Sequence, residues 1–265
     1  MNRRRQDRRI LEELIRLLDK KKTLAVFPGQ LNLEIGKFFL GMPYVAGTLE
    51  TKRDEHLIVN LREHDCFTFV ENVVALVWYL KSREKSFKAF QRILQKIRYR
   101  QGRLQGYSSR LHYFSDWIYD NQKKGIIRDI TAEIGGRPLR KAMTFMTTHP
   151  NLYPPLKDAS NLQKMKSVER SISKRSHFLI PKKALRRMED KICDGDLIAI
   201  TTNTEGLDVQ HVGLAERVKN RIHLLHSSSI EGKVVLSPKT LYGFLMQSRS
   251  RSGIMVARIV VKNMK

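Results

Sequence analysis

The amino-acid sequence predicts an α+β fold, with helices in the first half of the chain and an antiparallel sheet in the second. The first half has apolar residues at helical spacing, most clearly in the nearly uncharged run from Val70 to Leu80. The second half has short apolar segments near Leu197, His211 and Leu225, separated by turn residues. Helices that precede a run of strands favour a helical layer packed on an antiparallel sheet.

The elements of the first half follow in order. A basic amphipathic helix is expected within residues 1–24, and a second helix at Leu31–Leu40. A short strand, Leu57–Leu61, is expected to lead into the long apolar helix described above. A one-faced helix then runs from Phe87 to Ile97, and the segment Arg110–Tyr119 also has apolar residues at helical spacing.

The second half is interrupted by prolines before the sheet begins. Residues 135–187 contain five prolines, and the stretch 164–187 is strongly basic, so we expect a basic insertion or a segment that covers one side of a groove. After the three strands near Leu197, His211 and Leu225 come further elements of the sheet region: a hairpin or loop at 232–236, a short helix at Leu241–Met246 and a final strand at Ile254–Val261.

Composition limits the class of protein. The 265 residues are 41% hydrophobic with a mean hydropathy of −0.40, which fits one globular domain, and no apolar run is long enough to predict a transmembrane helix. The formal net charge of +24 attracts anionic partners, such as wall fragments, membranes or cell-surface polymers. No nucleic-acid-binding motif accompanies the charge, so no specific nucleic acid is expected. A generally basic proteome would also explain the charge.

Cys66 lies where the long apolar helix is expected to begin, directly after Asp65, a suitable N-cap residue. The free N–H groups of a helix start favour an anion and can lower a thiol pKa from about 8.5 to about 3.5–7.5. Cys66 is therefore a candidate nucleophile. The alternative is a buried structural cysteine. The only other cysteine, Cys193, is then expected to be free, because two cysteines make no disulfide framework.

A nucleophilic thiol requires a base, and the chain has eight histidines. His211 lies 145 residues after Cys66 on an expected strand, a separation typical of enzymes in which a helix supplies the thiol and a later sheet the imidazole. His223 and His226 share the next strand, but residues an odd number apart face opposite sides of it. Only one of them can orient the base. The alternative for each is a half-buried strand residue without a catalytic role.

Four segments appear in the order and contexts of one enzyme superfamily: Asp65-Cys66 with the following Phe-Thr-Phe-Val, Gly195-Asp196-Leu197, His211-Val212-Gly213-Leu214 and Leu225-His226-Ser227-Ser228. Upstream, Gly41-Met42-Pro43-Tyr44 matches a Gly-x-Pro-Tyr segment of the same enzymes. The chain thereby resembles the NlpC-type, papain-like cell-wall cysteine hydrolases. The long spacing from Tyr44 to Cys66 and the Arg110-Leu111-His112-Tyr113 segment resemble one branch, the N-acetylmuramoyl-L-alanine amidase-like family.

The resemblance covers residues 39–261 and implies a single catalytic domain over 1–265. It implies hydrolysis of the amide between N-acetylmuramic acid and L-alanine in peptidoglycan or its fragments. It also implies the catalytic roles: Cys66 as nucleophile, His211 as general base and then acid, and His226 as the group that fixes the imidazole tautomer. The backbone N–H of Cys66 is the first candidate to bind the oxyanion.

Four further residues are candidates for substrate binding: Tyr44, Arg110, His112 and Tyr113. For the last three, the helical spacing of the neighbouring apolar residues favours core packing as an alternative. No cofactor or metal is expected, because the sequence has no His-Glu-x-x-His or comparable ligand cluster.

Two other functions stay open: a different cell-wall peptide hydrolase, such as an endopeptidase, and a noncatalytic basic protein that binds nucleic acid. The resemblance implies a cell-envelope or periplasmic location with peptidoglycan or muropeptide as the partner. The first residues are basic but lack the uninterrupted apolar core of a signal peptide, so the cytoplasm is the alternative.

Overall fold

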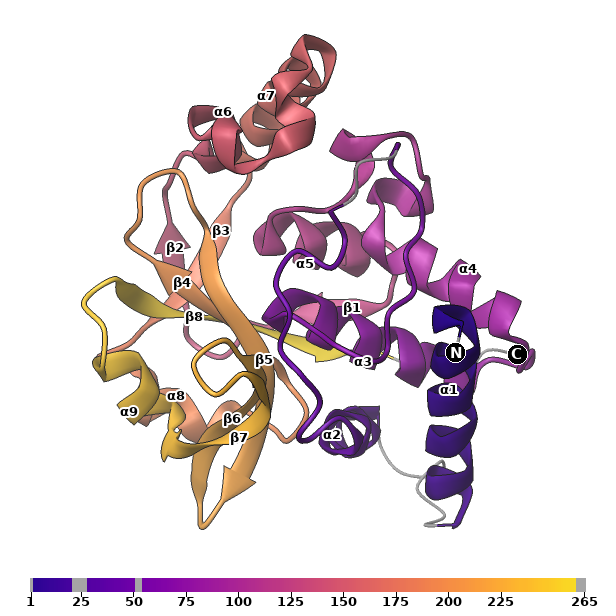
Figure 1. Cartoon of the computed structure of the whole chain (residues 1–265). Coiled ribbons are helices and arrows are strands. Elements are labelled where there is room, and N and C mark those ends of the chain that lie inside the picture. Colours follow the sequence, from indigo (N-terminus) through magenta and orange to yellow (C-terminus); the bar gives the residue numbers. More distant parts are fainter. Residues whose placement is uncertain (1, 21–27, 51–53, 261–265) are drawn as a thin grey trace.

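A layer of helices packs against one face of an antiparallel sheet in the computed structural model, which describes residues 2–20, 28–50 and 54–260 (Figure 1). The larger helices are α1 Arg3–Lys20, α2 Pro28–Phe38, α3 Cys66–Lys81, α4 Phe87–Arg98, α5 Phe114–Lys123 and α7 Ala159–Ser173. The short ones are α6 Phe145–Thr148, α8 Leu185–Met188 and α9 Leu241–Met246. The prediction of an α+β fold with an antiparallel sheet is confirmed. No helix among the described residues is long and apolar enough to cross a membrane.

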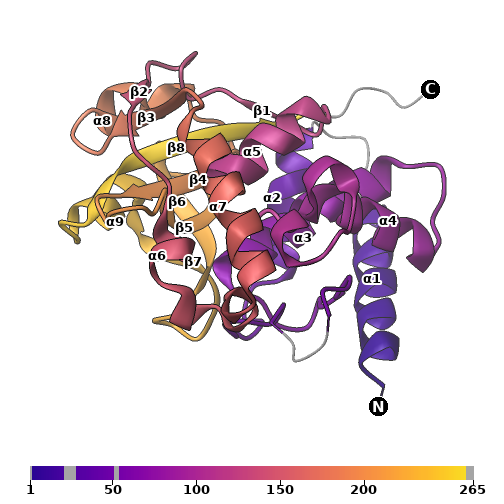
Figure 2. The same ribbon diagram turned by 90° about the horizontal axis from the view of Figure 1, so that it is seen from above.

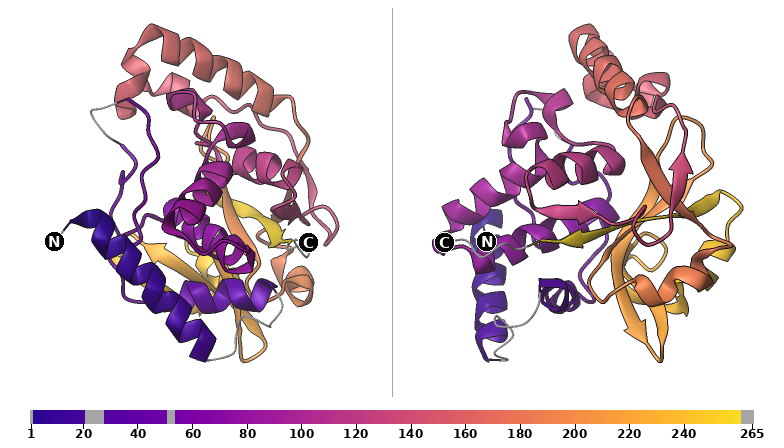
Figure 3. Two further views of the ribbon diagram at one scale, coloured as in Figure 1. Left: turned by 90° about the vertical axis from the view of Figure 1, so that its right-hand side faces the viewer. Right: turned by 180° about the vertical axis from the view of Figure 1, so that it is seen from behind.

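The sheet has the strand order β2-β3-β8-β4-β5-β6-β7, and β1 pairs with the same strand β8. The strands are β1 Ile127–Asp129, β2 Arg137–Leu139, β3 His177–Pro181, β4 Leu197–Thr202, β5 Val209–Val218, β6 Arg221–Ser228, β7 Lys233–Thr240 and β8 Arg251–Ile259. All of these pairs are antiparallel. Seen from behind, β8 crosses the middle of the molecule and α1 lies on the outer side of the helical layer (Figure 3).

Both faces of the sheet are buried, which the central strands show residue by residue. On β4, Leu197 and Ala199 belong to the core shared with α2 and α3, while Ile198 and Ile200 belong to the core on the other face, with α8 and α9. Successive residues of a strand point to opposite faces, so a continuous apolar run is what a strand between two layers requires.

Helix α3 begins at Cys66 because Asp65 caps it. The Asp65 carboxylate accepts a hydrogen bond from the backbone N–H of Thr68 at 2.7 Å, and the Thr68 hydroxyl accepts one from the Asp65 N–H at 3.0 Å. This reciprocal pair satisfies two donors that the first turn leaves free. Buried on most sides, α3 packs between α2, α4 and strand β5. The predicted cap and helix start are confirmed.

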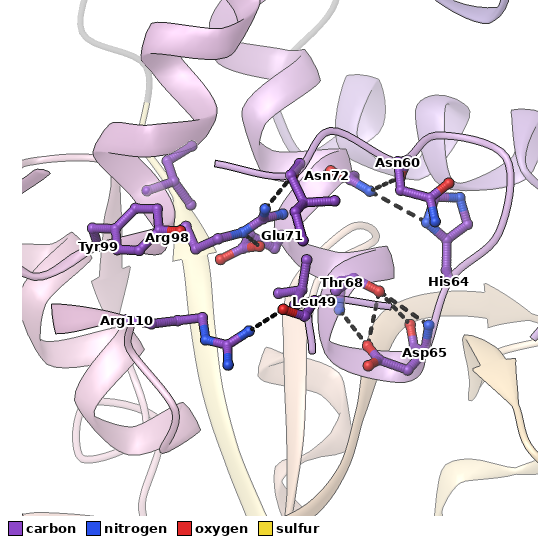
Figure 4. A network of polar contacts seen from close by, with 12 residues as sticks. Leu49, Asn60, His64, Asp65, Thr68, Glu71, Asn72, Arg98, Tyr99 and Arg110 are labelled. Carbon is purple, nitrogen blue, oxygen red and sulfur yellow. Dashed lines mark hydrogen bonds and ion pairs between the residues drawn. The ribbon is translucent and has the colours of Figure 1, made fainter. Parts of the chain in front are cut away.

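The strand predicted at Leu57–Leu61 is wrong, because this segment has no strand partner. Side chains satisfy its backbone instead (Figure 4): Asn72 donates to the Asn60 carbonyl at 2.9 Å, and Arg98 donates to the carbonyl of Ile58. The Leu61 N–H donates to Asp7 at 2.9 Å. Buried backbone groups need partners, and here they come from α1, α3 and α4.

The boundaries of several elements differ from the prediction. Helix α1 covers Arg3–Lys20 of the expected 1–24; residues 21–24 lie outside the described residues, as does the end of the last predicted strand. Helix α2 begins at Pro28, since proline is well suited to a first helical turn. Helix α5 begins at Phe114, because Arg110 before it is extended and bridges Tyr99.

The predicted insertion at 135–187 contributes to the sheet itself, through β2 and β3 at one edge. Its helices α6 and α7 stand at the top of Figure 1. They bury a separate apolar cluster with Tyr107 and Tyr113, to which Met146, Met165 and Ile172 contribute. The segment therefore contributes two strands to the sheet and an apolar cluster of its own.

Candidate active site

The Cys66 thiol lies where the start of α3 meets strand β5. Cys66 packs against the core cluster that includes Val212, and the backbone groups of Val212, Cys66 and Phe67 act to lower the pKa of its thiol. Val212 directly follows His211, so the thiol is seated beside the strand that carries this histidine. Cys66 is half-buried and Cys193 is exposed, and both are free thiols.

His211 and His226 form a hydrogen-bonded pair, which we call the imidazole pair. His211 Nε2 lies 2.6 Å from His226 Nδ1, and the rings are nearly perpendicular at 88°. Phe244 of α9 packs against both rings. His223 instead places its Nδ1 2.9 Å from the Ser237 carbonyl. The structure thus brings His211 together with His226, the histidine that the resemblance implied, and not with His223.

Gly213 makes room for this pair. A Cβ on Gly213 would lie 2.9 Å from the Cβ of His226 and 2.7 Å from the Leu225 carbonyl oxygen, closer than side chains pack. The glycine two residues after His211 therefore lets β6 bring His226 against its partner.

Burial keeps both the thiol and the imidazole pair uncharged at neutral pH. Burial, with the Asp65 charge adding to it, raises the pKa of Cys66 to about 12, although three N–H groups oppose the shift. Burial, and then the charges of His226 and Arg251, lowers the pKa of His211 to about 3. Burial and Arg251 lower the pKa of His226 to about 4. The expected lowering of the thiol pKa by the helix start is wrong, since burial outweighs it.

Tyr44 lies close to the thiol. It forms an isolated backbone bridge with His64, two residues before Cys66, and the charges that Cys66 and Asp65 carry when ionised add to burial in raising its pKa. The backbone N–H of Tyr44 donates to the Gly232 carbonyl at 2.8 Å. This predicted substrate-binding residue is therefore at the site, although binding itself stays a prediction.

His64 ties the parts of the site together, and the sequence did not single it out. It is fully buried, and its backbone joins the segment around Tyr44: its N–H donates to Pro43 and its carbonyl accepts from Val45, both at 3.0 Å. The same carbonyl accepts from the buried Ser227 hydroxyl at 2.8 Å. Ser227 follows His226, so β6 is fastened to the chain two residues before the thiol. The sequence could have indicated this link, because His64 directly precedes the Asp65-Cys66 motif and Ser227 directly follows His226.

The other three predicted substrate-binding residues have contacts within the protein. Arg110 pairs with Glu50 at 2.5 Å and donates to the Leu49 carbonyl at 3.2 Å (Figure 4). His112 Nε2 lies 2.9 Å from the Tyr107 carbonyl. The Tyr113 hydroxyl donates to Glu169 of α7 at 2.7 Å. All three side chains are therefore held by partners within the protein, and a role in substrate binding stays a prediction. Among the described residues, no group of three or more His, Cys, Asp or Glu is placed to hold a metal ion.

The fold and the site define a class: an α+β protein with a free thiol at the start of a buried helix and a hydrogen-bonded pair of imidazoles on two neighbouring strands of the sheet. A family model, AmiA-like or N-acetylmuramoyl-L-alanine amidase-like, matches residues 34–254. The chain belongs to this N-acetylmuramoyl-L-alanine amidase-like family.

Solved structures with the same fold include one that is named an amidase. The chain is 41% identical to an N-acetylmuramoyl-L-alanine amidase from Bacteroides uniformis, with a TM-score of 0.84 over 88% of this chain and 99% of that one. A Bacteroides fragilis protein provisionally named a xylanase is 42% identical, with a TM-score of 0.81 over 86% and 100%. A Legionella pneumophila protein at 21% identity, with a TM-score of 0.70 over 98% and 97%, shares the fold. Among curated proteins, none matches this chain.

Proposed function

We propose that this protein is a cysteine amidase of the NlpC-type, papain-like class that hydrolyses the amide between N-acetylmuramic acid and L-alanine in peptidoglycan or its fragments. The observation that carries the mechanism is the 2.6 Å contact between His211 and His226, because His211 directly precedes Val212, whose backbone acts on the Cys66 thiol. Membership of the amidase-like family supports the substrate class. We also propose the cell envelope as the place of action, where peptidoglycan lies.

The proposed reaction needs one particular tautomer of the imidazole pair. If His211 is to accept the thiol proton at Nδ1, its other nitrogen, Nε2, must carry a proton and donate it to His226 Nδ1. His226 is then the acceptor that holds His211 in the reactive tautomer and orientation. When His211 becomes positively charged during the reaction, its Nε2–H remains hydrogen-bonded to His226 Nδ1, and this hydrogen bond becomes charge-assisted.

The reaction begins from neutral groups. His211 Nδ1 removes the Cys66 proton as the sulfur attacks the lactyl carbonyl carbon, because a thiol with a pKa of about 12 holds little thiolate beforehand. The resulting imidazolium protonates the L-alanine nitrogen as the C–N bond breaks, and leaves a thioester. His211 then activates water to hydrolyse this thioester and regenerates the thiol. The backbone N–H of Cys66 and the Tyr44 hydroxyl are the donors we assign to the oxyanion.

Mass spectrometry with a defined muropeptide panel tests the proposal. Wild type is expected to release the sugar and a peptide that begins with L-alanine, and Cys66→Ala is expected to release neither. Cys193→Ala is the matched control and should retain activity. We expect a chelator to leave the wild-type rate unchanged. Activity that is lost to a chelator and restored by zinc would contradict the thiol mechanism.

Other products would favour the alternatives. Cleavage between two amino acids of the peptide would make the protein an endopeptidase. If no panel member is cleaved, the net charge of +24 favours a binder of nucleic acid, which a titration over salt concentration would reveal.

A further inference from the structure

A cavity of about 580 Å³ lies between α7 and two short 3-10 turns, Arg100–Gly102 and Tyr107–Ser109. In Figure 2, seen from above, α7 lies in front of the region that contains α5. The cavity is lined by Arg100, Lys164 and Arg175, together with four serines, two glutamines and Val168 as its one apolar residue among those described. We call it the arginine–serine pocket.

One buried carboxylate holds the two guanidinium groups of the pocket in place. The buried Asp116 pairs with Arg100 at 2.6 Å through one oxygen and with Arg175 at 2.5 Å through the other. The Arg175 guanidinium also stacks on the Tyr119 ring, 3.9 Å from its centroid. Both guanidinium groups are therefore fixed before any ligand arrives, which reduces the entropy lost on binding.

The pocket has more donors and positive charge than its own structure uses. Arg100 and Arg175 share one negative charge, and Lys164 adds a third positive charge at the rim. The Nη2 of Arg100 is buried, and no described residue accepts a hydrogen bond from it. A buried N–H group without an acceptor costs free energy, so a ligand that supplies an oxygen would gain from this position.

We propose that the arginine–serine pocket binds an acidic sugar, with the carboxylate on the cations and the hydroxyl groups on the serines and glutamines. A cavity of about 580 Å³ exceeds what a single small anion fills and lies in the usual range for small-molecule sites. The mixture of fixed guanidinium groups with hydroxyl and amide side chains matches a ligand that combines one carboxylate with several hydroxyls. If the proposed amidase reaction occurs, it frees such a carboxylate on N-acetylmuramic acid. The identity of the ligand rests on that function.

Calorimetric titration of the Cys66→Ala protein measures this binding without turnover. The probes are N-acetylmuramic acid, the uncharged N-acetylglucosamine and inorganic phosphate. We expect saturable binding of N-acetylmuramic acid and at least tenfold weaker binding of the other two. Lys164→Ala should weaken binding by up to about fivefold, the range of one exposed ion pair. Lys166→Ala, the same charge change on another face of α7, is the control and should bind as the parent does.

Three results would overturn the proposal: no saturable binding, phosphate binding as tight as the acidic sugar, or equal weakening by Lys164→Ala and Lys166→Ala. The first excludes the site, the second excludes a sugar as its ligand, and the third reduces the effect to overall charge. Thermal unfolding of each variant checks that it is folded. Because the binding assay uses an inactive protein, a failure of the amidase proposal would appear separately, as uncleaved muropeptide with wild type.

Discussion

Replacing His226 with alanine removes the acceptor that lies 2.6 Å from His211 Nε2. A buried donor left without a partner costs about 1–3 kcal/mol, so the variant should unfold at a lower temperature. The catalytic effect should be larger, because a positioned acid–base group contributes about 10²–10⁴ to the rate. We expect kcat to fall at least about 100-fold. His226→Asn keeps a carbonyl oxygen as acceptor and should recover part of this loss.

Initial rates of peptide release, followed by chromatography and mass spectrometry over a range of substrate concentrations, separate kcat from KM. His223→Ala is the matched control, since His223 lies on the same strand but contacts the Ser237 carbonyl at 2.9 Å. Wild-type kcat in His226→Ala would refute the tautomer role, as would an equal loss of kcat in His223→Ala. Asparagine that recovers no more than alanine would show that the acceptor is not what matters.

Three further predictions follow from the same geometry. Because burial raises the pKa of Cys66 to about 12, alkylation by iodoacetamide in a Cys193→Ser background should accelerate steadily from pH 7 to pH 10; a rate already constant at pH 7 would contradict this. The imidazole pair has folded pKa values of about 3 and about 4, below the ordinary 6.5. Between about pH 3 and pH 6.5 the unfolded chain therefore binds more protons than the folded one. The contribution of the imidazole pair to the free energy of unfolding should be fully present above about pH 6.5 and should decline toward pH 4. A melting temperature that stays constant from pH 6.5 to pH 4 would argue against this contribution. Ser227→Ala should cost about 1 kcal/mol and lower kcat without changing KM, because it releases the His64 carbonyl; Ser228→Ala, measured in the same rate and melting assays, should not lower kcat.

Local patterns in the sequence predicted the helix start and the choice between two histidines. Asp65 before an apolar run identifies an N-cap because the cap and the turn that it satisfies are only three residues apart. The two-residue period of a strand allowed only one of His223 and His226 to face His211, and the match of Leu225-His226-Ser227-Ser228 to the resembled enzymes favoured His226. These features depend on residues that are close in the sequence, so a short stretch of sequence is enough to predict them.

Features that depend on distant parts of the chain were mispredicted or missed. The thiol pKa depends on how deeply β5 and its neighbours bury Cys66, which helix position does not reveal. The segment Leu57–Leu61 has the composition of a strand, but Asp7, 54 residues before its partner Leu61, takes one of the positions that a neighbouring strand would occupy. The pairing of Arg110 with Glu50 was missed, because it joins segments 60 residues apart.

The neutral state of the Cys66 thiol has a consequence for chemical durability. A thiolate attacks peroxide and other oxidants, and the first product, a sulfenic acid, can be oxidised further to irreversible products. A thiol whose pKa is raised to about 12 by its surroundings is almost entirely protonated in neutral solution. If the proposed mechanism holds, the reactive anion forms only as the substrate is attacked, and we expect Cys66 to be oxidised more slowly between turnovers than the exposed Cys193.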